Sequence, residues 1–282
     1  GLDVNAANGL GGTALMDAAG GGHTETVTAL LAAPDLDVNA ADCYDITALM
    51  QAAARGHTET VTALLAAPGI DVNAANGLGG TALMRAAGRG HTVTVTALLA
   101  APGLDVNAAE NELGLTALIR AAEEGHTETV TALLAAPGID MNAADREGLT
   151  ALMDAAGQGN TGTVTALLTA PGIDVNAADG DGDTALMLAA EEGHTATVTA
   201  LLAAPDLDVN AAENELGLTA LMQAAAGGHT ETVTALLAAP GLEVSAANFN
   251  DSTALAIAEG HGHVETASLL HMRVAVAVAY GV

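Results

Sequence analysis

The stretch that decides the fold begins Thr150-Ala-Leu-Met-Asp-Ala-Ala156, continues as Thr161-Gly-Thr-Val-Thr-Ala-Leu-Leu168, and ends Pro171-Gly-Ile-Asp-Val-Asn-Ala-Ala178. Its opening Thr-Ala-Leu triplet recurs along the chain, and the eight copies begin at Thr13, Thr47, Thr81, Thr116, Thr150, Thr184, Thr219 and Thr253. Successive copies lie 34 or 35 residues apart. A fixed period of this size is typical of a solenoid, in which each unit is too small to bury its own apolar face.

Each unit is expected to contain two short helices. In the fifth unit Thr150 stands where a helix N-cap belongs, and the leucine and alanines that follow recur at helical spacing on one face. A second helix is expected from about Thr161 to Thr169, and Pro171 ends it because proline cannot continue the helical hydrogen-bond ladder. The Gly-Ile-Asp-Val-Asn-Ala stretch then forms an extended connection to the next turn. Helices this short need neighbouring units for stability.

The repeated pattern is Asp-x-x-Gly-x-Thr-Ala-Leu-Met-x-Ala-Ala-x-x-Gly-His-Thr-Glu-Thr-Val-x-x-Leu-Leu, followed by Asp-Val-Asn-Ala, and it resembles the ankyrin repeat. The usual Thr-Pro-Leu-His reads Thr-Ala-Leu-Met here, and Ala-Pro-Gly-Ile adds a residue before Asp-Val-Asn. The resemblance implies an all-α fold, an ankyrin-repeat solenoid of stacked helix-turn-helix units with protruding β-hairpin loops. We expect eight repeats as one continuous domain over residues 1–270, and an apolar C-terminal tail over residues 271–282.

Composition limits the possible ligands. The net charge of −28 comes from 34 acidic residues against six arginines, with no lysine. Because phosphate backbones and anionic lipids repel such a polyanion, we expect neither nucleic acid nor a membrane as partner. An interior of Ala, Leu and Val is thin and closely packed, which leaves little room for a bound small molecule. No cofactor is therefore expected.

Histidine recurs at one position of the repeat, at His23, His57, His91, His126, His194, His229 and His263. Neighbouring helices pack about 8–10 Å apart, whereas zinc ligands must all lie within about 2.0–2.3 Å of one ion. The histidines are therefore not expected to bind metal. The resemblance implies instead that each imidazole ties adjacent turns through backbone hydrogen bonds. Near the C-terminus His261, His263 and His271 lie closer together, but we expect no cysteine or carboxylate to complete a metal cluster.

The sequence contains no recognisable catalytic motif. The pairs Glu123-Glu124 and Glu191-Glu192 lie in expected turns, and exposed carboxylates lack the burial that separates catalytic pKa values. No nucleophile elbow, phosphate-binding loop or Cys/His pair is present. We therefore do not expect an enzyme. The recurring Thr24-Glu-Thr-Val-Thr28 pattern is interpreted as an exposed helix surface.

Arginine positions indicate a partner surface. The resemblance implies that contacts come from hairpin tips, from first helices and from the residues before Gly-His. The candidate partner-binding residues are Tyr44, Arg55, Arg85, Arg89, Arg120 and Arg146. Corresponding positions in repeats six and seven carry Asp181, Asp183, Glu191, Glu192 and Glu215. The alternative is local pairing, for instance of Arg120 with Glu123 or Glu124 at helical spacing.

We therefore expect a non-catalytic protein–protein interaction scaffold that contacts a protein partner through the grooved face of the repeats. The alternative is a structural protein whose copies stack head to tail into a filament, because both ends of the array read as apolar and the segment from Gly1 to Asn8 carries the Asp-Val-Asn-Ala motif that the last repeat lacks. The candidate self-association residues are Leu15, Val27, Leu30, Leu31, Leu269, Leu270, Val274, Val276, Val278 and Tyr280. The alternation from Val274 to Tyr280 fits a strand, with a long Ala-rich helix as the other possibility.

Overall fold

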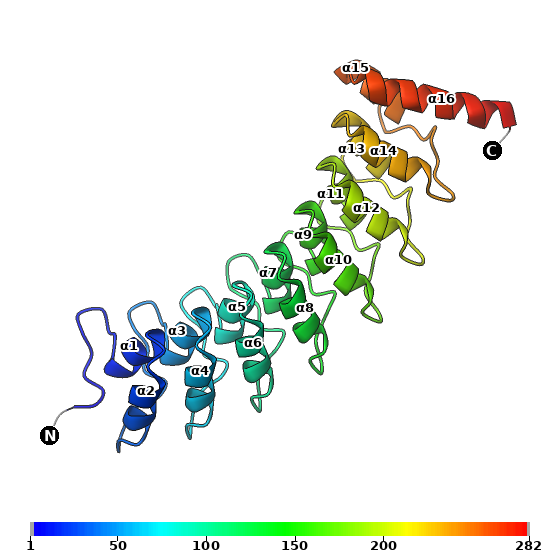
Figure 1. The fold of residues 1–282 in the computed structure, drawn as a ribbon. Helices are drawn as coiled ribbons and strands as arrows, with labels where there is room; N and C mark the ends of the chain where they lie inside the picture. Colours follow the sequence, from blue (N-terminus) through cyan, green and yellow to red (C-terminus); the bar gives the residue numbers. More distant parts are fainter. Residues whose placement is uncertain (1–2, 281–282) are drawn as a thin grey trace. The chain divides into compact units, whose positions relative to one another are not determined.

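The computed structural model describes residues 3–280, and it describes side chains through residue 275. Two compact units divide the chain, Gly1–Arg146 and Glu147–Val282. Within the described residues the structure is built from paired helices, and Figure 1 shows how the pairs follow one another in each unit. The predicted all-α fold of stacked helix-turn-helix units is confirmed.

Helices alternate between two rows in each unit. The first unit contains α1 (Ala14–Gly20), α2 (Thr24–Leu31), α3 (Ala48–Ala54), α4 (Thr58–Leu65), α5 (Ala82–Ala87), α6 (Thr92–Leu99), α7 (Ala117–Glu123) and α8 (Thr127–Leu134). The second contains α9 (Ala151–Gly157), α10 (Thr161–Leu168), α11 (Ala185–Glu191), α12 (Thr195–Leu202), α13 (Ala220–Ala226), α14 (Thr230–Leu237), α15 (Ala254–His261) and α16 (Val264–Tyr280). Odd-numbered helices pack against the next odd-numbered helix of the unit, and even-numbered helices do the same.

Threonine caps start the first helix of most repeats. The hydroxyl of Thr150, for example, accepts from the backbone N–H of Met153 at 3.4 Å. Equivalent caps are formed by Thr13, Thr47, Thr81, Thr116, Thr184 and Thr253. Each such cap stabilises its helix by about 1 kcal/mol. This confirms the predicted capping role of the Thr-Ala-Leu triplet.

The connecting loops are hairpins reduced to single antiparallel bridges. The bridges join Ala7 to Thr13, Ala41 to Thr47, Ala75 to Thr81, Ala109 to Thr116, Ala178 to Thr184, Ala212 to Thr219 and Ala247 to Thr253. Neighbouring tips are tied by one backbone hydrogen bond each, such as that from Asn111 N to Leu78 O at 2.8 Å. The asparagine of the Asp-Val-Asn-Ala motif adds a second tie, because Asn39 donates to Gly69 O and accepts from Asp71 N.

Small aliphatic side chains form the core. Leucine, methionine and alanine of the first helices are buried together with valine and leucine of the second helices; Leu49, Met50, Val61 and Leu64 are each at most 1% exposed. Such an interior is packed as densely as an organic crystal. Polar and charged side chains are therefore found mainly on the loops and at the helix ends.

The last helix decides between the two structures considered for the C-terminal stretch. The strand from Val274 onward is not formed and the long Ala-rich helix is, because α16 runs without a break from Val264 to Tyr280. No proline or glycine occurs between those two residues, so nothing in the sequence ends the helix. The helix also crosses residue 271, where the apolar tail was expected to begin. The side chains of Val276, Val278 and Tyr280 lie outside the described residues.

Candidate functional site: a cationic and an acidic hollow

The Gly-His dipeptide joins each repeat to the one before it. Nε2 of His57 lies 3.1 Å from Gly20 O, and the same contact is made by His194, His229 and His263 at 2.8–3.0 Å. The ring also lies on the preceding repeat's glycine: a Cβ on Gly22, whose φ is +68°, would stand 2.7 Å from Nδ1 of His57. The prediction that the imidazoles tie adjacent turns through backbone hydrogen bonds is confirmed for these four residues.

Threonines on the second helices have a role that the sequence interpretation missed. The Oγ1 atoms of Thr58 and Thr94 lie 2.8 Å apart, and the same pairing joins Thr24 to Thr60, Thr92 to Thr129, Thr161 to Thr197, Thr195 to Thr232 and Thr230 to Thr266. The later member of each pair is at most 1% exposed. The interpretation of this pattern as an exposed helix surface agrees with Thr26 in α2 but is wrong for these buried threonines, because the preceding repeat covers that face of their helices.

Two of the six predicted partner-binding residues also bind the preceding repeat. Nη1 of Arg55 donates to Gly20 O at 2.5 Å, and Nη1 of Arg89 donates to Ala54 O at 2.8 Å. Both arginines remain exposed. One guanidinium edge is thus fixed by the fold, which orients these long side chains at little further entropic cost.

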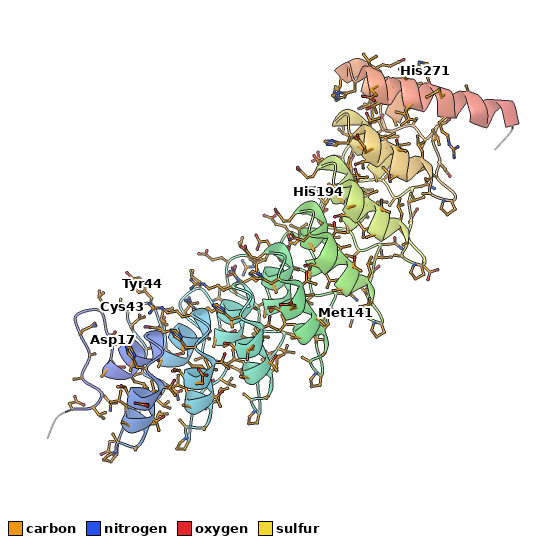
Figure 2. All side chains as sticks on the ribbon, viewed as in Figure 1. Asp17, Cys43, Tyr44, Met141, His194 and His271 are labelled. Carbon is orange, nitrogen blue, oxygen red and sulfur yellow. The ribbon has the colours of Figure 1, made fainter. Side chains whose placement is uncertain are left out.

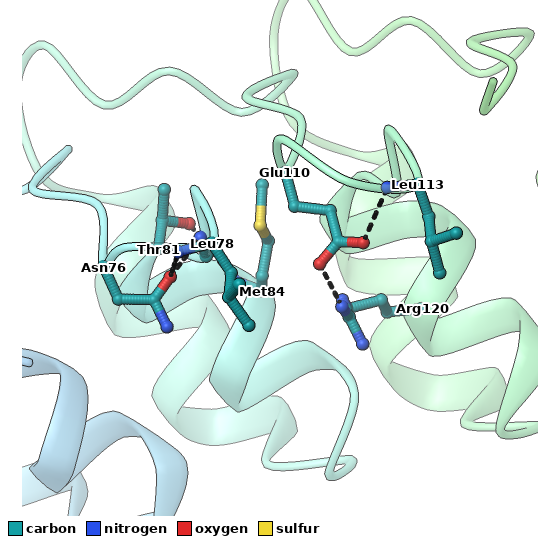
Figure 3. A network of polar contacts seen from close by, with 8 residues as sticks. Asn76, Leu78, Thr81, Met84, Glu110, Leu113 and Arg120 are labelled. Carbon is teal, nitrogen blue, oxygen red and sulfur yellow. Dashed lines mark hydrogen bonds and ion pairs between the residues drawn. The ribbon is translucent and has the colours of Figure 1, made fainter. Parts of the chain in front are cut away.

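Arg120 pairs across its own repeat. Its Nη2 atom lies 2.5 Å from Oε2 of Glu110, and the other carboxylate oxygen of Glu110 accepts from Leu113 N at 3.3 Å. Figure 3 shows this carboxylate between the loop and helix α7. This ion pair reaches from helix α7 back to the loop, to a carboxylate that the local pairing at helical spacing did not name.

Three of the predicted arginines come together around one hollow, which we call the cationic hollow. It has a volume of about 260 Å³, and the residues that line it are Asn76, Leu78, Gly80, Met84, Arg85, Gly88, Arg89, Glu110 and Arg120. Within the described part of the chain, the buried Nε atom of Arg85 has no hydrogen-bond partner. Burial lowers the pKa of the Arg85 guanidinium, Arg89 and Arg120 lower it further, and Asp42 opposes them.

Arg55, Arg146 and Tyr44 do not line this hollow. Arg146 is exposed at a hairpin tip, where its backbone N–H donates to Leu113 O at 2.8 Å. Tyr44 is 67% exposed on the loop before α3, beside the exposed Cys43, as Figure 2 shows. All six predicted partner-binding residues belong to the first unit.

The second unit carries a hollow in the same register with the opposite charge, which we call the acidic hollow. It measures about 210 Å³ and is lined by Asp181, Asp183, Glu191, Glu213, Glu215, Leu216, Leu218 and Gln223. Three repeats separate equivalent lining positions: Leu78 corresponds to Asp181, Gly80 to Asp183, Gly88 to Glu191, Glu110 to Glu213 and Arg120 to Gln223. The same positions of the repeat thus line both hollows, but the side chains at these positions differ in charge.

Burial and mutual repulsion act on the acidic hollow. Burial raises the pKa of Asp183, the Gln223 amide opposes this, and the charges of Asp179 and Glu213 add to the rise. Burial also raises the pKa of Glu191, with Asp183 contributing. Glu213 differs: burial acts to raise its pKa, but backbone N–H donors outweigh burial and lower it. Three of these donors lie 2.5–2.9 Å from its carboxylate.

The candidate self-association residues fall into two groups. Leu15 is 2% exposed and Val27 and Leu270 are 0% exposed, so the expectation that they lie uncovered at the ends is corrected. The helices that carry them pack against the other helix of their own repeat and against the neighbouring repeat of the same unit. Leu30, Leu31, Leu269 and Val274 are partly exposed. An apolar groove of about 350 Å³ runs between α14 and α16, lined by Thr234, Leu237, Ala238, Leu269, Met272 and Arg273.

The C-terminal histidines are held by other groups. His261 Nδ1 and His263 Nε2 both lie about 3 Å from Ala226 O, at 3.1 and 2.9 Å. Nε2 of His271 lies 2.9 Å from a carboxylate oxygen of Glu259. Among the described residues no group of three or more histidine, cysteine, aspartate or glutamate side chains is placed to hold a metal ion. No helix of the described part is long and apolar enough to cross a membrane.

Comparison with known proteins agrees with the architecture. The family model "Ankyrin repeats (3 copies)" matches residues 1–76, 68–145, 138–213 and 205–276. A search of curated proteins gave no match. Ankyrin repeats are generally non-catalytic modules of protein–protein interaction. The matched ranges span nearly all of the stacked helix pairs, and the chain therefore belongs to the ankyrin repeat family.

Proposed function

We propose that the chain is a non-catalytic scaffold that binds an acidic segment of a protein partner through the first unit, with the cationic hollow as the centre of the contact. The observation that carries this proposal is the grouping of Arg85, Arg89 and Arg120 around one hollow with a single carboxylate, Glu110. The chain has only six arginines among 34 acidic residues. Half of its cations therefore stand where they repel one another, which costs free energy unless an anion joins them.

Guanidinium chemistry supports a carboxylate as the group that enters the hollow. Arginine presents donors in a planar fork that matches a carboxylate, and charge-assisted bonds of this kind are stronger than neutral ones. The Nε donor of Arg85 is buried and unpaired among the described residues, and leaving a donor in that state costs about 1–3 kcal/mol. An incoming carboxylate relieves this cost and the repulsion among the arginines together.

The remaining predicted residues extend the contact outward. Arg55 and Arg146 are exposed, and Tyr44 offers an exposed aromatic ring of the kind enriched in binding hot spots. An elongated acidic ligand that follows the loops of the first unit reaches several of them at once. Nucleic acid and anionic membranes are disfavoured as partners because the net charge of −28 repels them at long range.

The proposal is tested with a fluorophore on Cys43, the single cysteine, and a peptide of alternating aspartate and glutamate as the probe. R85L and R120Q are the variants of choice, because the equivalent repeat positions already hold Leu188 and Gln223 in the same fold. Binding is measured by fluorescence titration at increasing salt. We expect each variant to weaken binding, and we expect salt to weaken it further because exposed charge pairs are screened.

Two controls define the result. R273Q removes one positive charge from the second unit and is expected to leave binding unchanged. A peptide of asparagine and glutamine with the same length is expected not to bind. Equal affinity of R85L, R120Q and the unmodified chain for the acidic peptide would remove the cationic hollow from the binding surface.

Self-association into a filament is the second candidate, and one observation favours it. Met272, which lines the apolar groove between α14 and α16, is 63% exposed, and Val264 at the start of α16 is 77% exposed. Burying apolar surface releases about 25 cal/mol per Å², so this face is able to drive contact between copies. Sedimentation velocity over a wide concentration range tests it. Concentration-dependent growth that M272E abolishes supports the filament, whereas a monomer at every concentration excludes it.

A further inference from the structure

The two hollows differ at the residue that stands beside the loop glutamate. In the first unit the guanidinium of Arg120 pairs with Glu110. In the second unit Glu213 occupies the position of Glu110, but Gln223 occupies that of Arg120. The repeat therefore contains a place that accepts a guanidinium, and the second unit has no guanidinium of its own there.

The second unit also has no arginine or lysine at this place. Its sequence contains one arginine, Arg273, and no lysine. Arg273 lines the groove between α14 and α16 instead, and its Nη2 atom donates to Leu237 O at 3.0 Å. The carboxylates of the acidic hollow are consequently left without an arginine or lysine of this unit as counter-charge.

Gln223 supplies an observation that is independent of the acidic cluster. Its side chain lines the hollow and is 8% exposed. The amide nitrogen donates to Asp183 Oδ1 at 2.8 Å, and this bond fixes which end of the amide carries the oxygen. Within the described residues that oxygen, Oε1, is buried and accepts no hydrogen bond. A buried acceptor in this state calls for a donor from outside the chain.

We propose that the acidic hollow binds the guanidinium group of an arginine side chain from a protein partner. The guanidinium carries five N–H donors, and the hollow offers the acceptor atoms to match: the carboxylates of Asp183 and Glu191 and the Oε1 atom of Gln223. The ion pair of Arg120 with Glu110 is the precedent for a guanidinium in this register of the repeat. Burial raises the pKa of Asp183 and of Glu191, so both carboxylates gain from a cation that replaces lost hydration.

The inference rests on the proposed function in one respect, that the chain binds protein segments, but it assigns a different unit and the opposite ligand charge. Acidic stretches of a partner are the ligand of the cationic hollow, and an arginine of a partner is the ligand of the acidic hollow. Its failure is therefore separable from a failure of the cationic hollow.

The test follows the side-chain amide of Gln223 by ¹H–¹⁵N NMR during titration with short acetylated peptides. One peptide carries a single arginine among alanines, and the matched peptide carries citrulline, which has the same shape without the charge. We expect the arginine peptide to shift the Gln223 resonance with saturation and the citrulline peptide to leave it in place. D183N is expected to weaken binding about tenfold, which corresponds to about 1.4 kcal/mol.

Three further variants make the outcome decisive. Q223R installs the residue that Arg120 provides in the other unit, and we expect it to pair with Glu213 and abolish binding, read from the backbone resonances around the hollow. E191Q retains the amide of Gln223 and is expected to weaken binding even if Q223R does not fold. R85L/R120Q alters only the first unit and is expected to bind the arginine peptide normally. Equal shifts with citrulline, or full affinity in D183N, would overturn the proposal.

Discussion

Arg120 and Glu110 form an ion pair that closes a hairpin loop onto the helix that follows it. The distance from Nη2 to Oε2 is 2.5 Å, the Glu110 side chain is 7% exposed and the Arg120 side chain is 35% exposed. A carboxylate this buried depends on its partner, because a lone buried charge loses its hydration without compensation.

Removing one member of this pair should therefore cost more than removing both. We expect R120Q to lower the free energy of unfolding by about 1–3 kcal/mol, between the values for exposed and fully buried pairs. The double variant R120Q/E110Q is expected to recover part of that loss. Urea denaturation of the two single variants and the double variant measures the coupling, and strict additivity of the losses contradicts the pairing.

Glycine before histidine should be irreplaceable for a reason beyond backbone strain. Gly90 has φ +67°, and a Cβ there would stand 2.7 Å from Nδ1 of His126. Gly103 has φ +78°, but no described atom lies within 4 Å of its Cβ position. Both Gly→Ala variants carry the strain of a left-handed backbone, about 1–3 kcal/mol. We expect G90A to cost a further ~1–3 kcal/mol from overpacking, and thermal unfolding of the pair measures the difference.

The threonine pairs between repeats should contribute measurably to stability. Thr94 is 1% exposed and its hydroxyl lies 2.8 Å from that of Thr58. T94V keeps the shape and removes the bond, so we expect a loss of about 1 kcal/mol. T96V alters an exposed hydroxyl that bonds within its own helix and serves as the control, with an expected change within about 0.5 kcal/mol. If T94V and T96V lower the free energy of unfolding equally, the threonine pair between repeats contributes no more than an exposed hydroxyl.

The acidic hollow predicts opposite pH dependences for two carboxylates. The pKa of Asp183 is raised from 3.8, so its carboxyl favours folding below that pH and this advantage is lost as pH rises through the folded-state pKa. We expect D183N to raise Tm at neutral pH and to change it little in acid. The pKa of Glu213 is lowered from 4.5, so its contribution is present above 4.5 and is lost as pH falls through the lower folded-state value. E213Q is expected to lower Tm at neutral pH, and calorimetry over a range of pH compares the two variants.

Zinc should leave Tm unchanged. The Gly-His imidazoles already bind backbone carbonyls of the preceding repeat, as His57 binds Gly20 O. A metal has to break these contacts before it gains a ligand. Differential scanning calorimetry with and without zinc checks this, and a clear rise in Tm on addition of zinc speaks against a purely structural role.

The sequence alone predicts the repeat, its helices and its caps, because these depend on local chemistry that each unit repeats. Thr150 caps its helix and His57 ties two turns, as expected. The buried threonines of the second helices escaped prediction, because the Thr-Glu-Thr-Val-Thr pattern looks polar until the preceding repeat covers one side of the helix. Leu15 and Val27 were misjudged because packing inside the unit buries them even without a preceding repeat.

The candidate site was predictable in its residues but not in their grouping. Arginine positions can be read from the repeat register, which is how Arg85, Arg89 and Arg120 were selected. Their grouping around one hollow depends on the loop that brings Glu110 to Arg120. Glu110 lies in that loop and not on the helix of Arg120, so the spacing of residues along a helix does not predict this contact. Gln223 by itself does not indicate a binding site. Its role is suggested only by comparison with Arg120, which occupies the same repeat position three repeats earlier.

The threonine pairs have a consequence for how such a gene can change. Thr58 offers Thr94 the same hydroxyl that Thr24 offers Thr60 and that Thr92 offers Thr129. Unequal recombination that excises one whole period from the first unit therefore restores a threonine opposite every threonine, with no orphaned partner at the seam. The number of repeats can therefore change while the threonine hydrogen bonds between repeats are kept. A repeat that carries a hollow of either charge can be gained or lost as a whole unit.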